Sequence, residues 1–168
     1  MPEELPDFRP ILAALNAAGV RFVVIGGLAM VGHGSNHITQ DLDVGYSRDR
    51  ANLQAIAEAL RTAAPRLRGF PADLPFIWDV QTIKGQTNMT LETDLATVDL
   101  LGDIPGVDSF QGLWQRSIPM EMFGIPVRVA SLADLISMKR AAARPKDIEH
   151  LHELEALRRL IEEEDTHP

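Results

Sequence analysis

The 168-residue chain contains no cysteine. This excludes a disulfide framework, a thiol nucleophile, and zinc or iron–sulfur sites built on cysteine ligands. Long hydrophobic runs are also missing, because no stretch approaches the ~20 apolar residues of a membrane span. The N-terminal sequence MPEELPDFRP lacks the basic start and apolar run of a signal peptide. We therefore expect a cytoplasmic protein that does not associate with membranes.

Positive charge is scarce in this sequence. Sixteen Lys and Arg stand against 24 Asp and Glu, a formal net charge of −8, which argues against a protein that coats nucleic acid nonspecifically. Residues 147–168 hold eight acids and two arginines and so carry −6 of this charge. We expect a catalytic-type domain over residues 1–146 and an acidic C-terminal helix over residues 147–168, packed on the same domain.

Two common phosphate-binding motifs are absent. No G-x-x-x-x-G-K-[ST] occurs, which excludes P-loop chemistry. A Rossmann-type dinucleotide site requires G-x-G-x-x-G, whereas the two glycines after the first apolar run are adjacent. A dinucleotide binder is therefore the weaker alternative.

The apolar spacing predicts a mixed α/β domain that ends in two helices. A helix around Phe8 to Leu15 precedes a strand over Val20–Ile25, which ends on a glycine turn. The sequence pattern of residues 66–86 does not decide between a strand and a short helix. The remaining predicted strands lie at 38–46, 89–93 and 96–101, and a hairpin of 120–123 and 126–130 is joined by Gly124-Ile125. Helices are predicted after an N-cap at Asp49, at 110–117, at 132–143 after a cap at Ser131, and along a stripe from Ile148 to Ile161.

The most informative residues are the acids of Asp41-Leu42-Asp43. Residues i and i+2 of a strand project from one face, so the two carboxylates stand close together and repel each other unless a cation lies between them. Oxygen-only ligands of this kind suit Mg²⁺. If Asp99 lies on a neighbouring strand with its side chain on the same face, it completes a site for two metal ions. The alternative is a solvated face on an edge strand.

Gly26-Gly27 lies between the first strand and the aspartate pair. A turn without β-carbons allows backbone N–H groups to approach a triphosphate. Lys139 could reach the same phosphates, or it could simply complement the dipole at the end of its helix. His33 and His37 are four residues apart, but Gly34 between them argues against the helix that a zinc pair would need. His150 and His152 are two residues apart on the predicted last helix, so they point to different faces, and we expect both to be solvated.

Several short segments, taken together, resemble one family. They are Gly26-Gly27-Leu28-Ala29, His33-Gly34, Thr39-Gln40-Asp41-Leu42-Asp43, Thr97-Val98-Asp99-Leu100-Leu101, and the late residues Asp134-Leu135-Ile136, Lys139 and Arg144-Pro145-Lys146-Asp147. This pattern resembles the nucleotidyltransferase superfamily with the DNA polymerase β-like fold. It is most similar to small bacterial members, many of which occur in toxin–antitoxin or abortive-infection systems.

The resemblance implies a mixed sheet flanked by helices and transfer of a nucleoside monophosphate from an NTP such as ATP to an acceptor hydroxyl. The acceptor would be a small molecule, a tRNA or a protein. Mg²⁺, with Mn²⁺ as the alternative ion, would assist the reaction. The implied metal ligands and catalytic residues are Asp41, Asp43 and Asp99, with Asp99 also as the base; the implied nucleotide-binding residues are Gly26, Gly27, Thr39 and Lys139.

One position departs from the family pattern. Relatives often carry Arg four residues before the first aspartate, where this chain has His37. A second function therefore competes with catalysis: a catalytically weak member that serves as a binding module, such as an antitoxin-like protein that docks its partner through the C-terminal helix.

Overall fold

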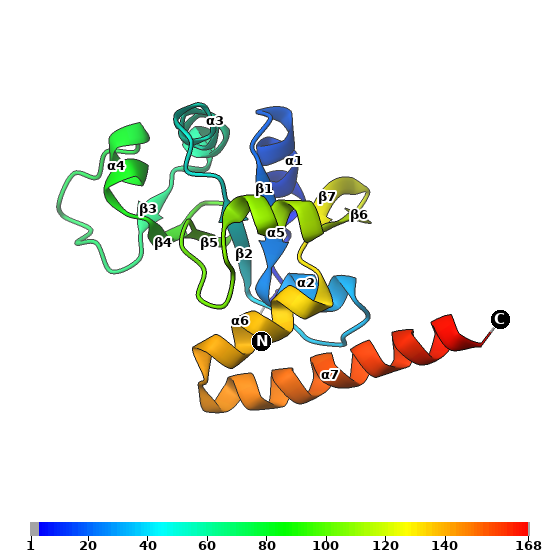
Figure 1. Cartoon of the computed structure of the whole chain (residues 1–168). Helices are drawn as coiled ribbons and strands as arrows, with labels where there is room; N and C mark the ends of the chain where they lie inside the picture. The colour runs from blue at the N-terminus through cyan, green and yellow to red at the C-terminus, as the bar shows by residue number, and fades with distance from the viewer. Residues whose placement is uncertain (1–3, 168) are drawn as a thin grey trace.

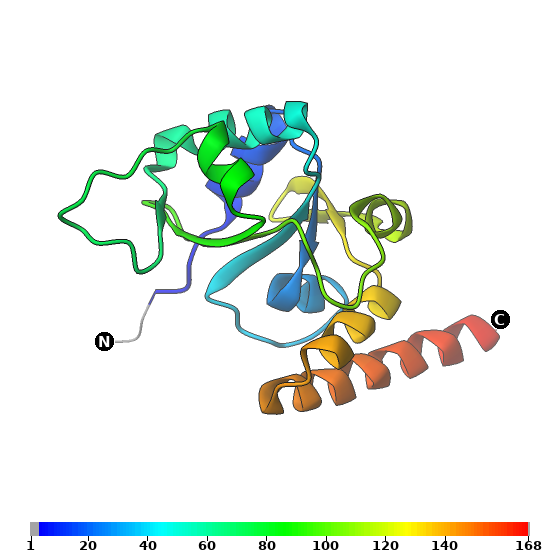
Figure 2. The ribbon, with the colours of Figure 1, turned by 60° about the vertical axis from the view of Figure 1, so that its left-hand side comes forward.

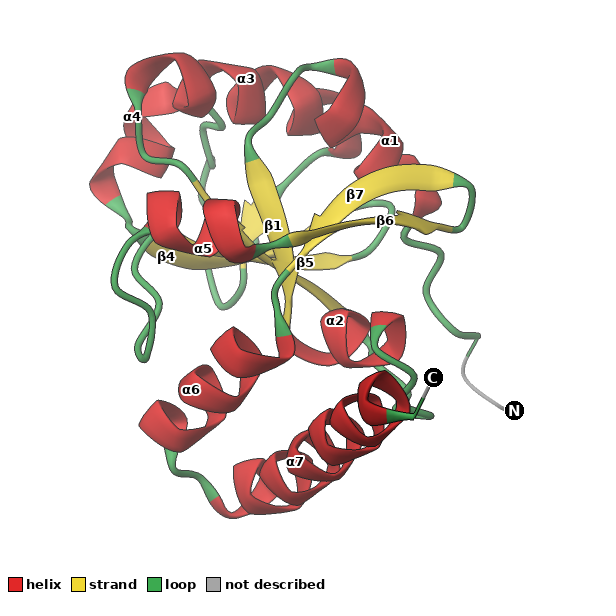
Figure 3. Ribbon diagram, turned by 45° about the vertical axis from the view of Figure 1, so that its right-hand side comes forward, coloured by secondary structure: helices red, strands yellow, loops and turns green. Residues whose placement is uncertain are grey.

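The computed structural model describes residues 4–167 of the chain, and within them the strands form one sheet with helices on both faces (Figures 1 and 3). The strands are β1 (Phe22–Ile25), β2 (Asp41–Tyr46), β3 (Arg66–Leu67), β4 (Asn88–Glu92), β5 (Thr97–Leu101), β6 (Ile118–Met122) and β7 (Ile125–Val129). The α-helices are α1 (Arg9–Ala17), α2 (Gly26–Gly32), α3 (Arg50–Leu60), α4 (Val80–Gly85), α5 (Phe110–Arg116), α6 (Leu132–Ala142) and α7 (Pro145–Thr166). The predicted mixed sheet flanked by helices is confirmed.

The order of strands in the sheet is β3-β4-β5-β2-β1-β7-β6. β1 is antiparallel to β2 and parallel to β7, whereas β2 is parallel to β5, so the sheet is mixed. All four residues of β1 are buried, as expected for a short apolar strand between two neighbours. Helices α1, α3 and α4 lie together over one face (Figure 2). The opposite face is left to α2, α5 and the functional side chains.

Local sequence signals explain several boundaries. The carboxylate of Asp49 accepts a hydrogen bond from the backbone N–H of Asn52 at 2.9 Å and caps α3, as predicted. The Oγ of Ser131 accepts from the N–H of Asp134 at 3.1 Å and caps α6. Gly19 ends the first helical segment with φ +70°. These caps need no tertiary information, so the sequence alone identifies them.

The predicted hairpin turn was wrong by one residue. The turn lies at Phe123-Gly124, with φ +54° and +79°, rather than at Gly124-Ile125. A two-residue turn of type I′ needs positive φ at both positions, and pairing of Met122 with Ile125 fixes which residues occupy them. The ambiguous segment 66–86 contains a short strand, β3, and a short helix, α4.

Helices α6 and α7 pack against each other below the sheet (Figure 3). α7 begins at Pro145 and is twice as long as α6, with 22 residues against 11, so its C-terminal part extends past its neighbour (Figure 1). Leu154 is fully buried, but Ile148 and Ile161, predicted on the same stripe, are 54% and 41% exposed. The predicted stripe is therefore wrong at both ends. The division of the chain at residue 146 stays a prediction.

None of the helices in the described part of the chain has the length and apolar character needed to cross a bilayer.

Candidate active site

The predicted aspartates meet at one end of the sheet because of the strand register. β1 ends at Ile25, which pairs with Asp43 of the antiparallel β2. On its other side, Asp43 pairs with Asp99 of the parallel β5. Paired residues project from the same face of a sheet, and Asp41 shares that face with Asp43 because it lies two residues away. The structure therefore brings Asp41, Asp43 and Asp99 together.

The three aspartates line a cleft of about 730 Å³. All seven residues that the sequence predicted for the site border this cleft: the three aspartates together with Gly26, Gly27, Thr39 and Lys139. Its border also includes residues outside this predicted set, among them His37, Thr90, Arg144, Lys146, Asp147 and His150. The three predicted aspartates come from β2 and β5, whereas the basic residues and Asp147 come from α6 and the start of α7.

The carboxyl group of Asp43 is electrostatically strained. Burial raises its pKa most, and a hydrogen bond with Asp99 and repulsion from Asp99 and Asp41 raise it further, while the positive charge of Lys139 lowers it. In the absence of a cation, the neutral form of the Asp43 carboxyl is therefore favoured. Among residues 4–167, no group of three or more His, Asp and Glu side chains is already arranged to hold a metal ion.

The same residues nevertheless have the chemistry that a hard divalent cation requires. All three donors are carboxylates on one face of the sheet, which is the type of ligand that Mg²⁺ takes together with phosphate oxygens. A cation between them would relieve the repulsion that now raises the pKa of Asp43. Thr90, which is not one of the three aspartates, orients the Asp99 carboxylate, because Thr90 Oγ1 donates a hydrogen bond to Asp99 Oδ1 at 2.5 Å.

The glycine turn, Gly26-Gly27, closes tightly over the aspartates. Gly26 has φ +65°, and a Cβ there would overlap Asp43 Oδ2 and lie 2.9 Å from Asp43 Cγ. A Cβ at Gly27 would lie 2.9 Å from Thr39 Oγ1. Thr39 Oγ1 in turn donates a hydrogen bond to the backbone carbonyl of Asp41 at 2.9 Å. Any side chain at the turn would collide with the side chain of Asp43 or Thr39, so glycine is required here for close approach.

A buried carboxylate organises the basic side of the cleft. Asp147 is 1% exposed, and its oxygens lie 3.1 Å from Lys139 Nζ and 2.9 Å from Arg144 Nε. Burial raises the pKa of Asp147, but hydrogen bonds from Arg144 and Lys139 outweigh it and lower the pKa to about 2. Lys139, predicted to bind nucleotide, is therefore held beside the aspartates through an ion pair with α7.

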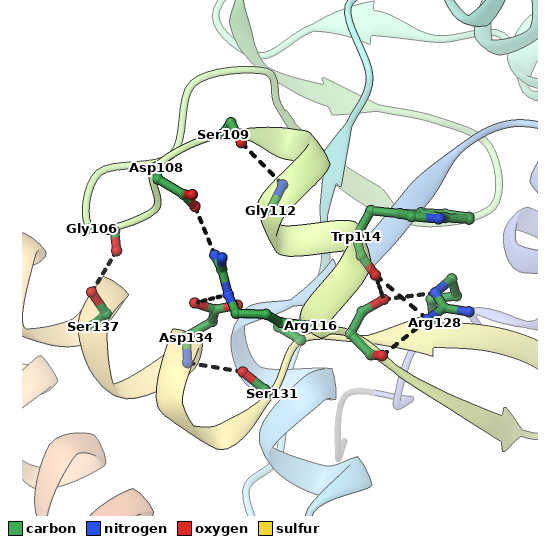
Figure 4. Close-up of polar contacts among 12 residues, drawn as sticks. Gly106, Asp108, Ser109, Gly112, Trp114, Arg116, Arg128, Ser131, Asp134 and Ser137 are labelled. Atoms are coloured by element: carbon green, nitrogen blue, oxygen red, sulfur yellow. Dashed lines mark hydrogen bonds and ion pairs between the residues drawn. The ribbon is translucent and has the colours of Figure 1, made fainter.

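A second polar network fixes α6, the helix that carries Lys139 (Figure 4). The guanidinium of Arg116 on α5 lies 2.9 Å from Asp134 Oδ2 and 2.7 Å from Asp108 Oδ1. Ser137 Oγ on α6 donates to the carbonyl of Gly106 at 2.5 Å. These contacts attach the first turns of α6 to the segment that follows β5, and so set the position of one wall of the cleft.

One of the histidines, His150, differs from the sequence interpretation, whereas His152 is exposed as expected. His150 was expected to be solvated, yet it borders the cleft and its ring packs on that of His37 at a centroid distance of 4.8 Å. His33 Nε2 instead contacts the carbonyl of Ala130 at 2.8 Å, away from His37. Spacing on a helix shows that His150 and His152 face different ways, but it does not show which of them faces the cleft.

The fold is that of nucleotidyltransferases. A solution structure of the antibiotic-resistance factor ANT(2'')-Ia aligns with a TM-score of 0.55 at 17% identity, over 94% of this chain and 90% of that one. A crystal structure of ANT(2'')-Ia in complex with adenylyl-2''-tobramycin aligns with the same TM-score and identity, over 95% and 97%. The Thermotoga maritima protein TM1012, assigned to the nucleotidyltransferases, aligns with a TM-score of 0.50 at 17% identity, over 93% and 91%.

The chain belongs to the family described as nucleotidyl transferases of unknown function (DUF2204), which matches residues 4–166. A comparison with curated proteins found no match. The predicted resemblance to nucleotidyltransferases is thus confirmed, while the link to toxin–antitoxin systems stays a prediction.

Proposed function

We propose that the chain transfers a nucleoside monophosphate from a nucleoside triphosphate, such as ATP, to an acceptor hydroxyl, with Mg²⁺ or Mn²⁺ held by Asp41, Asp43 and Asp99. The observation that carries this proposal is one cleft that combines these oxygen ligands with a glycine turn and basic residues. Membership of a nucleotidyl transferase family supports the reaction class. A bound divalent cation would neutralise phosphate charge and the negative charge that develops during transfer.

Different side chains contribute to different parts of the proposed in-line displacement. Asp99 accepts the proton of the acceptor hydroxyl as that oxygen bonds to the α-phosphorus. The bond from the α-phosphorus to its bridging oxygen breaks, and pyrophosphate leaves with the electron pair. Thr90 holds the Asp99 carboxylate in one orientation through its 2.5 Å hydrogen bond. The order of events requires no residue outside the cleft.

The triphosphate contacts in this proposal are Gly26, Gly27, Thr39 and Lys139. The glycine turn offers backbone N–H groups at a point where no β-carbon keeps an anion away. Lys139 lies near enough to Asp43 to lower its pKa, so its charge reaches the region between the aspartates and α7. An anion in that region would have the positive charge of Lys139 on one side and, on the other, the three aspartates with their bound divalent cation.

The acceptor is a hydroxyl of a small molecule, a tRNA or a protein. A structure with the same fold was solved with adenylyl-2''-tobramycin, which supports tobramycin as the first small-molecule acceptor to test. Total tRNA and a protein extract complete the set. Each acceptor class is separable by size, so one labelling reaction distinguishes them.

The test incubates the protein with each of the four α-labelled NTPs, Mg²⁺ or Mn²⁺, and the three acceptor fractions. Wild type is expected to label one fraction, and EDTA or the double variant Asp41→Asn/Asp43→Asn is expected to abolish labelling. Asp99→Asn should lower the rate about 100-fold or more through loss of the base. Asp73→Asn, which removes an exposed acid from a loop outside the cleft, is the matched control.

Two results would refute the proposal. One is the absence of both labelling and NTP-dependent thermal stabilisation with either metal ion. The other is labelling that persists unchanged in the double aspartate variant. A binding module that docks a partner through α7 would give the first result.

A further inference from the structure

Two imidazoles meet in the wall of the cleft, and the proposed reaction gives neither of them a role. The rings of His37, in the loop before β2, and His150, near the start of α7, pack edge to face at an interplanar angle of 81°. The same segments are joined beside them, because Ser35 Oγ donates to Glu153 Oε1 at 2.5 Å and accepts from the backbone N–H of His37 at 3.0 Å. The loop before β2 is thereby attached to α7.

The imidazole pair lies next to the groups proposed to bind phosphate. A Cβ at Gly27 would lie 2.9 Å from His37 Cδ2, so the His37 ring packs on the glycine turn. His150 follows Asp147 by about one helical turn on α7, and Asp147 holds Lys139. The pair therefore lies between the glycine turn and the basic side of the cleft.

Burial and the positive charge of Lys139 keep the ring of His150 neutral. Burial lowers its pKa most, followed by the positive charge of Lys139 on α6 and the neighbouring His37, whereas Asp147 and Glu153 on α7 act in the opposite direction. The net direction is downward from an ordinary value of 6.5. At pH 7 the imidazole thus carries one N–H and one lone pair.

The hydrogen-bonding capacity of this ring is not met by the protein. His150 Nδ1 is buried and has no hydrogen-bond partner within the described residues 4–167. His150 also borders the cleft, and the burial of Nδ1 leaves Nε2 as the ring nitrogen that is able to face it. A buried N–H without an acceptor is costly, so an acceptor in the cleft favours the tautomer with the proton on Nε2.

We propose that His37 and His150 form a subsite for the terminal phosphates of the nucleoside triphosphate, in which His150 Nε2 donates a hydrogen bond to a phosphate oxygen. This inference rests on the proposed function, which supplies the triphosphate. Phosphate fits better than the nucleoside, because the glycine turn and Lys139 flank the pair. A hydrogen bond to a charged acceptor contributes about 10- to 100-fold in affinity.

The test measures binding of ATP, AMP and inorganic tripolyphosphate to the full chain by calorimetry, with Ca²⁺ as the divalent ion. His150→Phe keeps an aromatic ring against His37 and removes the buried Nδ1, so it is expected to melt at or above the wild-type temperature. His37→Ala removes the other ring of the pair, which lies in the loop before β2. His152→Phe is the matched control, because His152 is exposed on the same helix.

Wild type and the control are expected to bind ATP equally, and the two pair variants about 10- to 100-fold more weakly, with AMP affinity unchanged. Equal ATP affinity in all four proteins would overturn the subsite and leave the proposed function standing. Equal weakening of ATP and AMP would assign the pair to the nucleoside and overturn the phosphate subsite.

Tripolyphosphate separates the two hypotheses. Binding of tripolyphosphate that depends on the pair, in a wild-type protein that binds no nucleotide, would keep the subsite and refute the proposed function. Failure of wild type to bind either ligand would overturn both.

Discussion

The ion pairs of Asp147 should stabilise the fold as well as orient the site. Its pKa is lowered from 3.8 to about 2, so the ionised carboxylate is favoured in the folded chain. This difference corresponds to about 2 kcal/mol at pH 7. Asp147→Asn keeps the shape of the side chain but not its charge. We expect the free energy of unfolding of the variant to be about 2 kcal/mol lower than that of wild type, which corresponds to a Tm about 4–8 °C lower for a chain of this size.

The pH dependence follows from the direction of the shift. A carboxyl group whose pKa is lowered by folding stabilises the protein above its unfolded value of 3.8, and this contribution is lost as the pH falls toward about 2. The stability gap between wild type and variant should therefore be full at pH 7 and 5 and about half as large near pH 3.

Urea denaturation at pH 7, 5 and 3 measures this gap directly. The matched control is Glu162→Gln, which removes an exposed partner of Arg158 from the same helix and should change stability by less than about 0.5 kcal/mol. Equal stability of Asp147→Asn and wild type at pH 7, or a gap that does not shrink by pH 3, would refute the reasoning.

Three further changes test other parts of the site. Gly26→Ala forces a β-carbon into φ +65° and into Asp43, so it should cost at least about 1–2 kcal/mol in urea denaturation and abolish ATP binding, whereas Gly85→Ala, which meets nothing within 4 Å, should change neither. Because folding raises the pKa of Asp43, the wild type loses stability as the pH rises above the unfolded pKa. In EDTA, the Tm of Asp43→Asn should therefore exceed that of wild type at pH 8, and by a smaller margin at pH 5. Equal Tm values of the two proteins at both pH values would contradict this. Arg116→Met leaves the buried carboxylate of Asp134 without its 2.9 Å partner and should lower the free energy of unfolding by about 2 kcal/mol; a loss below about 0.5 kcal/mol would show that solvent replaces the arginine.

Local signals made much of the fold predictable from the sequence. The apolar run of β1, the caps at Asp49 and Ser131 and the i, i+2 spacing of Asp41 and Asp43 depend only on neighbouring residues. The meeting of Asp43 with Asp99 was predictable only as a condition, because it depends on which strands pair. That information lies in the register of β2 and β5, which no local pattern contains.

The basic wall of the cleft was harder to predict. Lys139 was identified from a motif, but its ion pair with Asp147 depends on the packing of α6 on α7. His150 was assigned to solvent because helical spacing gives relative directions and not the position of the cleft. The structure of residues 66–86 was not predictable for another reason, since Gly69, Pro71 and Pro75 interrupt the apolar pattern before a period is established.

The parallel pairing of β2 with β5 has a consequence for how the protein matures. Asp43 and Asp99 are 56 positions apart in the chain, and only this non-local pairing joins them. Contacts of such long range form late and slowly in folding, because the intervening loop must be closed before the contact is gained. A nascent chain in which β2 has been synthesised but β5 has not therefore holds the hydrated carboxylates of Asp41 and Asp43 without Asp99 beside them. The capacity to concentrate negative charge at one point arises in a single step when the sheet closes.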